Sequence, residues 1–175
     1  MHQVRLQTER HPDVTDVDIE MMQRAIKLAK KAATLGEVPV GAIVYKGSKV
    51  LAEGYNVRES ASDPTGHAEL IAISKAGKAL GDWRLTDCSL AVTLEPCPMC
   101  AGALVNARLG RLIYGAADPK AGACHTLYEI PIDDRLNHRV AMIGGVMANE
   151  CRALLRDFFQ QRRQINRDTR NARSA

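Results

Sequence analysis

The sequence predicts an α/β protein of three layers, in which helices cover both faces of a central mixed sheet of five strands. The first observation behind this prediction is a pair of adjacent strand-like segments within residues 38–56, typical of a hairpin. The second is the alternation of helical and strand-like segments that follows the hairpin. The third is size and composition: 175 residues, of which 46% are hydrophobic and 4% aromatic, suit one domain with an aliphatic core.

The first predicted helix follows residues 1–14, which we expect to form a flexible arm. Thr15 is the predicted N-cap of this helix, and Asp18 is the expected partner in a capping box. Gly36 predicts the end of the helix. Between these limits, apolar residues recur at helical spacing: Ile19, Met22, Ile26, Ala29 and Ala33.

The rest of the chain alternates between strands and helices. The hairpin turns at residues 46–49, and a loop then leads into a second helix that begins at His67. A loop rich in Gly, Ala and Pro, with a short helix inside, is expected over residues 117–137. The other expected elements are a strand over 88–95, a helix over 97–110, a strand over 111–116, a strand within 140–147 and a helix over 148–164.

The positive charge of the chain is concentrated at its C-terminal end. The net charge is +4; residues 151–175 hold seven Arg and two Asp (+5), and residues 1–150 hold 17 Lys or Arg and 18 Asp or Glu (−1). A basic end of this kind often contacts nucleic acid, although it also serves simply as a solvated helix end. We therefore expect a domain over residues 15–164 and a basic, flexible tail over residues 165–175.

Several features predict a cytoplasmic protein without a membrane partner. No apolar run approaches the ~18 residues that a membrane span requires. The polar N-terminal segment has no apolar centre of the kind found in signal peptides. Five cysteines, an odd number, also argue against the disulfide framework of a secreted protein.

Two cysteines, Cys97 and Cys100, stand at the predicted start of the third helix, in the segment TLEPCPMCAGA. Residues three apart on a helix share a face, so both sulfurs can reach one ion. The partial positive charge of a helix N-terminus also favours the thiolate form. The pair is therefore half of a metal site, a redox pair, or two buried side chains that happen to be close.

His67 is a candidate for the other half of a metal site, because it too stands at a predicted helix start. One histidine and two cysteines make three protein ligands, the number found in a catalytic zinc site with an open fourth position. A structural zinc would require a fourth protein ligand, for which Cys88, Cys124 and His125 are available. Both kinds of zinc site remain open at this point.

Glu69, two residues after His67, would give such a metal site a catalytic function. Zinc lowers the pKa of a bound water to about 7, and a nearby carboxylate can take its proton and return it to a leaving nitrogen. The alternative is that Glu69 is only a first-turn glutamate that favours the helix dipole.

Together these motifs resemble the zinc-dependent nucleoside and nucleobase deaminases, whose signature is HAE followed by PCxxC. The sequence is most similar to the bacterial tRNA-specific adenosine deaminases, over roughly residues 16–164. The segments that carry this resemblance are EVPVGAIV (37–44), GYN (54–56), DPTGHAE (63–69), TLEPCPMCAGA (93–103), and the NHR and DFF…RR of the C-terminal part.

The resemblance implies a cytidine-deaminase-like fold, a homodimer, and hydrolytic deamination of adenosine to inosine at the wobble position (34) of a tRNA anticodon stem-loop. It implies one Zn²⁺ per chain, held by His67, Cys97 and Cys100, with the metal activating the water that attacks C6 of the base. Glu69 is implied as the proton shuttle. The residues implied in binding the RNA substrate are Asn56, Ala68, Asp118, Lys120, Phe158, Phe159, Arg162 and Arg163.

The sequence departs from the family pattern at Gly66, where alanine is usual, and at Cys124-His125, where smaller residues are usual. Glu95 fits the pattern, and we expect a structural role for it. Two other functions remain open: a deaminase of the same fold that acts on guanine, cytosine or cytidine, and a non-catalytic, zinc-stabilised nucleic-acid-binding module. Exposed aromatic and basic side chains on the last helix would favour RNA over a small molecule, and a four-ligand zinc site would favour the module.

Overall fold

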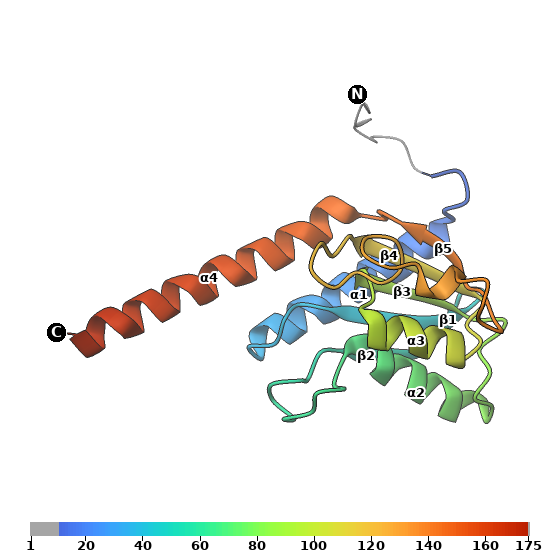
Figure 1. The fold of residues 1–175 in the computed structure, drawn as a ribbon, viewed down its shortest axis with the longest axis horizontal. Helices are drawn as coiled ribbons and strands as arrows, with labels where there is room; N and C mark the ends of the chain where they lie inside the picture. Colours follow the sequence, from blue (N-terminus) through green and yellow to red (C-terminus); the bar gives the residue numbers. More distant parts are fainter. Residues whose placement is uncertain (1–10, 175) are drawn as a thin grey trace.

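The computed structural model describes residues 11–174 and consists of one five-stranded sheet between two layers of helices (Figure 1). The strand order is β2-β1-β3-β4-β5; β1 runs antiparallel to β2 and to β3, whereas β3, β4 and β5 are parallel. The predicted three-layer fold with a mixed sheet is confirmed. The elements are α1 (Asp16–Thr34), β1 (Gly41–Lys46), β2 (Lys49–Tyr55), α2 (Ala68–Leu80), β3 (Ser89–Leu94), α3 (Pro98–Asn106), β4 (Arg111–Ala116), η1 (Ile130–Ile132), β5 (Ala141–Gly144) and α4 (Ala148–Ser174).

Each face of the sheet has its own apolar core, because successive side chains of a strand point to opposite faces. In β1, Ala42 and Val44 belong to the core that α2 and α3 cover, whereas Ile43 and Tyr45 belong to the core that α1 and the start of α4 cover. Helices α2 and α3 therefore lie side by side on one face, and their N-termini come together where β2 and β3 end (Figure 1).

Glycine in β2 allows α2 to lie close to the sheet. A Cβ atom at Gly54 would lie 2.2 Å from the carbonyl oxygen of Ala68 and 2.9 Å from the backbone nitrogen of Ala72. These distances are too short for real atoms, so no larger residue fits without moving the first turn of α2. The close packing fixes the position of the helix start, where the candidate site residues stand.

The N-terminal cap of α1 has the predicted form. Thr15 accepts a hydrogen bond from the backbone N–H of Asp18, and the Asp18 carboxylate accepts one from the backbone N–H of Thr15. Asp18 is buried and also accepts hydrogen bonds from the Tyr45 hydroxyl (2.5 Å) and the Arg111 guanidinium (2.8 Å). This network connects α1 to two strands at the end of the sheet away from the site.

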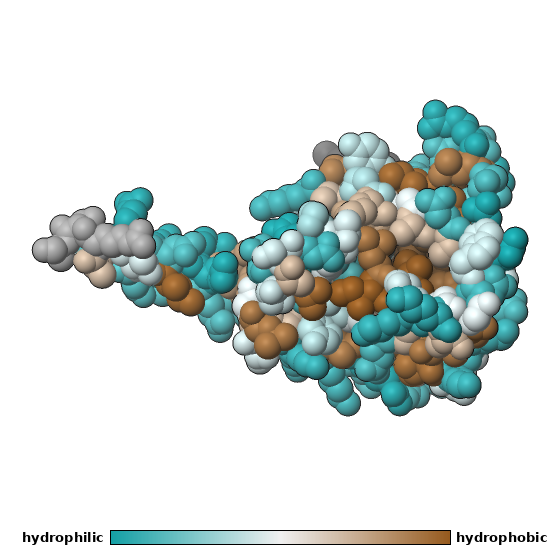
Figure 2. Space-filling model, turned by 90° about the horizontal axis from the view of Figure 1, so that it is seen from below, coloured by the Kyte–Doolittle hydropathy of each residue, from teal (hydrophilic) through white to brown (hydrophobic). Residues whose placement is uncertain are grey.

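The terminal elements differ from the predictions. Helix α4 was predicted to end at residue 164, but it continues to Ser174, so the predicted tail is helical through that residue. No Gly or Pro interrupts it, and the Gln164 side chain donates a hydrogen bond to Asp168 one turn later (2.9 Å). Figure 2 shows the outer part of α4 as a mostly hydrophilic arm beside the body of the molecule.

Other differences are small. The third helix was predicted over residues 97–110, but it ends at Asn106, because Arg108 adopts a left-handed backbone conformation with φ of 54°. Residues 1–10 of the predicted arm lie outside the described residues, and Val14, at its end, is buried in the α1 core. Among the described residues, no helix has the length and apolar character needed to cross a membrane.

Candidate active site

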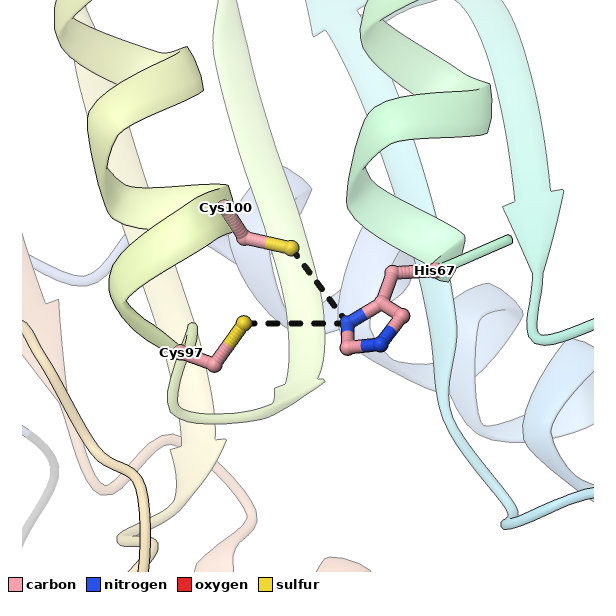
Figure 3. A group of neighbouring side chains, drawn as sticks. All are labelled: His67, Cys97 and Cys100. Atoms are coloured by element: carbon pink, nitrogen blue, oxygen red, sulfur yellow. Dashed lines mark hydrogen bonds between the residues drawn. The ribbon is translucent and has the colours of Figure 1, made fainter. Parts of the chain in front are cut away.

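The three predicted metal ligands meet at the N-termini of α2 and α3. His67 is the N-cap residue of α2, Cys97 is the N-cap residue of α3, and Cys100 lies one turn later and is buried. The His67 Nδ1 atom is 3.7 Å from the Cys97 sulfur and 3.6 Å from the Cys100 sulfur. Figure 3 shows the imidazole of one helix start facing the two sulfurs of the other.

The distances within this group suit a tetrahedral metal ion. One nitrogen and two sulfurs all lie within 4.8 Å of one another. Bonds of about 2.0–2.3 Å in tetrahedral geometry would separate the ligand atoms by roughly 3.3–3.8 Å, which includes both measured distances. In the described part of the chain this is the only such group, and Cys88, Cys124 and His125 do not join it. The arrangement has three protein ligands, as an open zinc site requires.

The two sulfurs differ in acidity. A hydrogen bond with Cys100, assisted by His67, lowers the pKa of Cys97 to about 4. The same hydrogen bond, together with burial, raises the pKa of Cys100 far above its ordinary value. Cys97 therefore gives up its proton more readily than Cys100, and binding of a cation by both sulfurs would require loss of the proton that they share.

Glu69 lies in the first turn of α2, lines the same pocket as His67 and Cys97, and is only 4% exposed. Its Oε2 atom is buried and has no hydrogen-bond partner within the described chain. Burial raises the pKa of this carboxyl group above its ordinary value. Because buried polar atoms are normally hydrogen-bonded, this oxygen is suited to a water molecule or substrate group beside the metal ligands.

The pocket above these residues has a volume of about 200 Å³. Asn56 lines it, and its Oδ1 atom accepts a hydrogen bond from the backbone N–H of Ala68 (2.9 Å), which fixes the start of α2. Asp118 also lines the pocket, and its side chain accepts hydrogen bonds from the backbone N–H groups of Lys120 (2.9 Å) and Ala121 (3.2 Å). Lys120 itself is exposed, beside the pocket mouth.

Two buried carboxylates hold the loops on either side of the pocket. Glu37 accepts hydrogen bonds from the backbone N–H groups of Glu59 (3.1 Å) and Ser60 (2.6 Å), in the loop between β2 and α2. Glu37 is not among the functional residues predicted from the sequence. The only signal in the sequence is that Glu37 is an acidic residue directly before a strand-like apolar segment. Nothing in the sequence indicates that it binds backbone N–H groups more than 20 residues away.

Glu95, at the end of β3, holds the loop that follows β4. Its carboxylate accepts hydrogen bonds from the Thr126 hydroxyl and from four backbone N–H groups, those of Asp118 (3.0 Å), Cys124 (3.2 Å), His125 (2.8 Å) and Thr126 (2.9 Å). Burial alone would raise the pKa of Glu95, but these hydrogen bonds, led by that of Thr126, lower it. The predicted structural role of Glu95 therefore has a definite physical form: it shapes one wall of the pocket.

Replacing Glu95 by glutamine is expected to lower the free energy of unfolding by about 1.5–3 kcal/mol, the usual contribution of hydrogen bonds to a charged group. The new amide would point N–H donors at backbone N–H donors, so the loop after β4 would lose its anchor. Denaturant unfolding of the variant and of the exposed control Glu59→Gln measures the difference. Equal stability of the two variants would show that Glu95 does not hold this loop.

The predicted RNA-binding residues of α4 differ in exposure. Phe158 is 9% exposed and packs at the base of the helix, whereas Phe159 is 43% exposed. Their rings meet edge to face with centroids 5.4 Å apart, and the Arg162 guanidinium lies 5.9 Å from the Phe158 ring. Arg162 and Arg163 are both exposed. Only Phe159 of the two rings is thus available to stack on another molecule.

The chain is similar to known proteins over most of its length. A model of the family described as MafB19-like deaminase matches residues 17–163. The tRNA-specific adenosine deaminase of Bacillus subtilis (strain 168) is 44% identical over 149 residues, which is 85% of this chain and 92% of that protein. The tRNA-specific adenosine deaminase of Haemophilus influenzae is 43% identical over 151 residues, covering 86% of this chain and 87% of that protein.

Solved structures agree with these relatives. A structure from a study of A-to-I editing by tRNA:A34 deaminases at the wobble position of transfer RNA has a TM-score of 0.75 and 38% identity, covering 78% of this chain and 99% of that chain. The guanine deaminase of Bacillus subtilis is also similar, with a TM-score of 0.54 and 42% identity over 56% of this chain and 63% of that chain. The likeness thus extends both to an RNA-modifying deaminase and to a small-molecule deaminase.

Proposed function

The chain belongs to the MafB19-like deaminase family and to the group of tRNA-specific adenosine deaminases, and from this premise we propose that it hydrolyses adenosine to inosine at the wobble position of a tRNA anticodon. One structural observation carries the proposal: a buried glutamate oxygen without a partner lies in a pocket beside three metal-ligating side chains. That arrangement is suited to hydrolytic removal of an amino group from a base.

We propose zinc as the metal, held by His67, Cys97 and Cys100. The donor set and its spacing support this assignment, because a mixture of imidazole and thiolate ligands at tetrahedral spacing suits zinc. When bound, zinc supplies the Lewis acidity that makes a water molecule nucleophilic near neutral pH. All five cysteines are free thiols, which supports a cytoplasmic location, where thiols remain reduced.

Glu69 moves the protons of the reaction. Its carboxylate accepts a proton from the attacking water and delivers it to the amino group, which leaves the base as ammonia. Water and adenosine thus give inosine and ammonia, and the glutamate returns to its starting state. The raised pKa of the buried carboxyl group suits both steps, because the group holds a proton more readily than an exposed glutamate.

The substrate base would enter the pocket between the two anchored loops. We propose that Asn56 contacts the nucleoside, that Asp118 and Lys120 contact the anticodon loop, and that the exposed groups of α4 contact the flanking RNA. Ala68 is fully buried and donates its backbone N–H to Asn56, so it positions that side chain instead of meeting the nucleoside. Phe159 stacks on a base, whereas buried Phe158 supports that ring from behind. The α4 residues in this proposal are Phe158, Phe159, Arg162 and Arg163.

A small-molecule deaminase is the second candidate, because the similarity to guanine deaminase covers more than half of the chain. The exposed ring and cations of α4 favour RNA. Incubation of the zinc-loaded protein with an anticodon stem-loop containing A34, and separately with adenosine, guanine and cytidine, distinguishes the two. Formation of inosine in the stem-loop, with the three small molecules unchanged, supports the proposal. Deamination of guanine, with the stem-loop unchanged, would favour the small-molecule deaminase instead.

We further propose a homodimer, formed through the face of α2, α3 and η1. Exposed apolar side chains gather there, and small residues on α3 permit close approach; the residues are Leu80, Met99, Gly102, Ala103, Leu127, Tyr128 and Ile132. Figure 2, seen from the side on which α2 lies, shows apolar surface near the middle of this face. An exposed apolar patch of this kind marks an interaction site.

Sedimentation at micromolar concentration is expected to give twice the chain mass of 19.1 kDa. Replacing Met99 by lysine should shift the protein towards the monomer, because a charge at the centre of the contact would lose its hydration. Replacement of the exposed Ile165 on α4 by lysine is the matched control and should leave the dimer intact. A parent protein that sediments as a monomer would contradict the proposal.

A further inference from the structure

One face of α4 carries a row of arginines with a single exposed aromatic ring among them. The members of this arginine row are Arg152, Arg156, Phe159, Arg163, Arg167 and Arg170. Successive members are three or four residues apart, so at 3.6 residues per turn they fall within a stripe roughly 80° wide. Six side chains therefore face the same way along the helix.

The other faces of α4 have different compositions. The acidic residues Glu150, Asp157 and Asp168 recur at intervals of 7 and 11 residues, on a face about 130° from the row. The side chains that pack against the sheet, including Cys151 and Phe158, lie on a third face. Five of the seven arginines within α4 thus share one face and the acidic residues share another, unlike an ordinary solvated helix end, in which opposite charges alternate.

The row continues far beyond the body of the protein. From Phe159 to residue 172 every side chain is exposed. Arg152 and Arg170 are 18 positions apart, so the row is about 27 Å long at 1.5 Å per residue. The family model ends at residue 163, and therefore Arg167 and Arg170 belong to a part of the chain that it does not include.

The projecting half of α4 lies on the same side of the molecule as the pocket loops. Figure 1 shows that α4, the loop between β2 and α2, and the loop after β4 all extend in the same direction from the sheet. A nucleic acid whose unpaired loop occupies the pocket would therefore extend past α4. Near the body the row offers an aromatic ring with arginines, whereas farther out it offers arginines alone.

We propose that the outer part of the arginine row binds the phosphate backbone of the double-helical stem of the RNA whose loop enters the pocket. This inference rests on the proposed function. A guanidinium group can donate two parallel hydrogen bonds to the oxygens of one phosphate. In a stem the bases pair with each other, so phosphates are the groups that such side chains can bind. Arg152 and Arg156, near the body of the protein, bond to Asn149 and Asp157 within the helix.

The test compares binding of two RNAs that share one loop sequence: a stem-loop, and a shortened RNA in which the loop has unpaired ends. In the double variant Arg167→Gln and Arg170→Gln, the Kd for the stem-loop should rise roughly tenfold at low salt. The slope of log Kd against log salt concentration should fall by about two, one for each lost phosphate contact. The Kd for the shortened RNA should not change.

A matched control restores the charge on another face of α4. Adding Gln161→Arg and Gln164→Arg to the double variant returns the original net charge but places the cations 60° or more from the row's edge. We expect this relocated variant to bind the stem-loop as weakly as the double variant does. Binding equal to that of the parent would overturn the proposal, because net charge alone would then explain the affinity.

Two other results would also overturn it. If the double variant loses equal affinity for both RNAs, the arginines contact the loop and not the stem. If the double variant no longer has the oligomeric state of the parent, the row is an interface between protein chains. Because the binding measurement does not depend on turnover, a failure of the proposed deaminase function can be distinguished from a failure of the stem-binding proposal. If no inosine forms but the stem-loop contact responds as expected, the protein binds the stem without deaminating the loop.

Discussion

Replacing Glu69 by glutamine is expected to lower the rate of deamination by roughly 10²–10⁴-fold, the usual contribution of a general acid–base group. Glutamine has almost the same size, but its amide does not exchange a proton with water or with a leaving amine near neutral pH. The Oε2 atom of Glu69 has no partner within the described chain, so the substitution breaks no hydrogen bond at that atom. Loss of the buried charge should leave the fold and the metal content unchanged.

The measurement is single-turnover formation of inosine in the A34 stem-loop, together with metal analysis and thermal unfolding. Glu150→Gln is the matched control, because Glu150 is an exposed acidic residue in the first turn of another helix. The control should retain the full rate. If the Glu69 variant also retains it, Glu69 serves only to favour the start of α2.

Replacing Cys100 by serine is expected to lower zinc affinity by more than about 100-fold, which exceeds the effect of changing a residue that only supports a ligand. Cys100 is fully buried, and its sulfur is one of three ligand atoms. A serine hydroxyl is a poorer ligand for zinc than a thiolate at neutral pH. Zinc content should fall from about one ion per chain to far below this value, and the deaminase activity should fall with it.

Two buried cysteines that do not join the ligand group provide the controls. Cys88→Ser and Cys124→Ser each change a buried thiol in the same way, and both variants should keep about one zinc ion per chain. Loss of zinc from the Cys124 variant would mean that the site has a fourth protein ligand. The site would then be closed, as in a structural zinc centre.

Local patterns predicted much of the fold and the ligand group. The strand-like apolar segments and the Thr15–Asp18 capping box depend on neighbouring residues, so the sequence alone was sufficient. The ligands could be predicted because each stands at the start of a helix, and the short strands that lead to these helices place the two starts side by side.

Features that depend on distant partners could not be predicted in the same way. Glu37 holds backbone N–H groups 22 and 23 residues away, and no residue type marks such partners. The burial of Phe158 and the exposure of Phe159 depend on how α4 meets the sheet. The predicted α4 is too short because the basic composition of residues 165–174 is typical of a flexible tail, although nothing there stops a helix.

Glu95 holds the loop after β4 mainly through backbone N–H groups, which every amino acid except proline provides. The exposed side chain of His125 can therefore change during evolution without loss of these backbone hydrogen bonds, whereas Thr126 also donates through its hydroxyl and a Cβ atom at Gly122 would collide with the Glu95 carboxylate. Cys124 and His125 both donate through their backbone, but the Cys124 side chain is buried in the core, whereas that of His125 is exposed. A lineage, or a laboratory selection, can thus change residue 125 while the wall of the pocket keeps its shape.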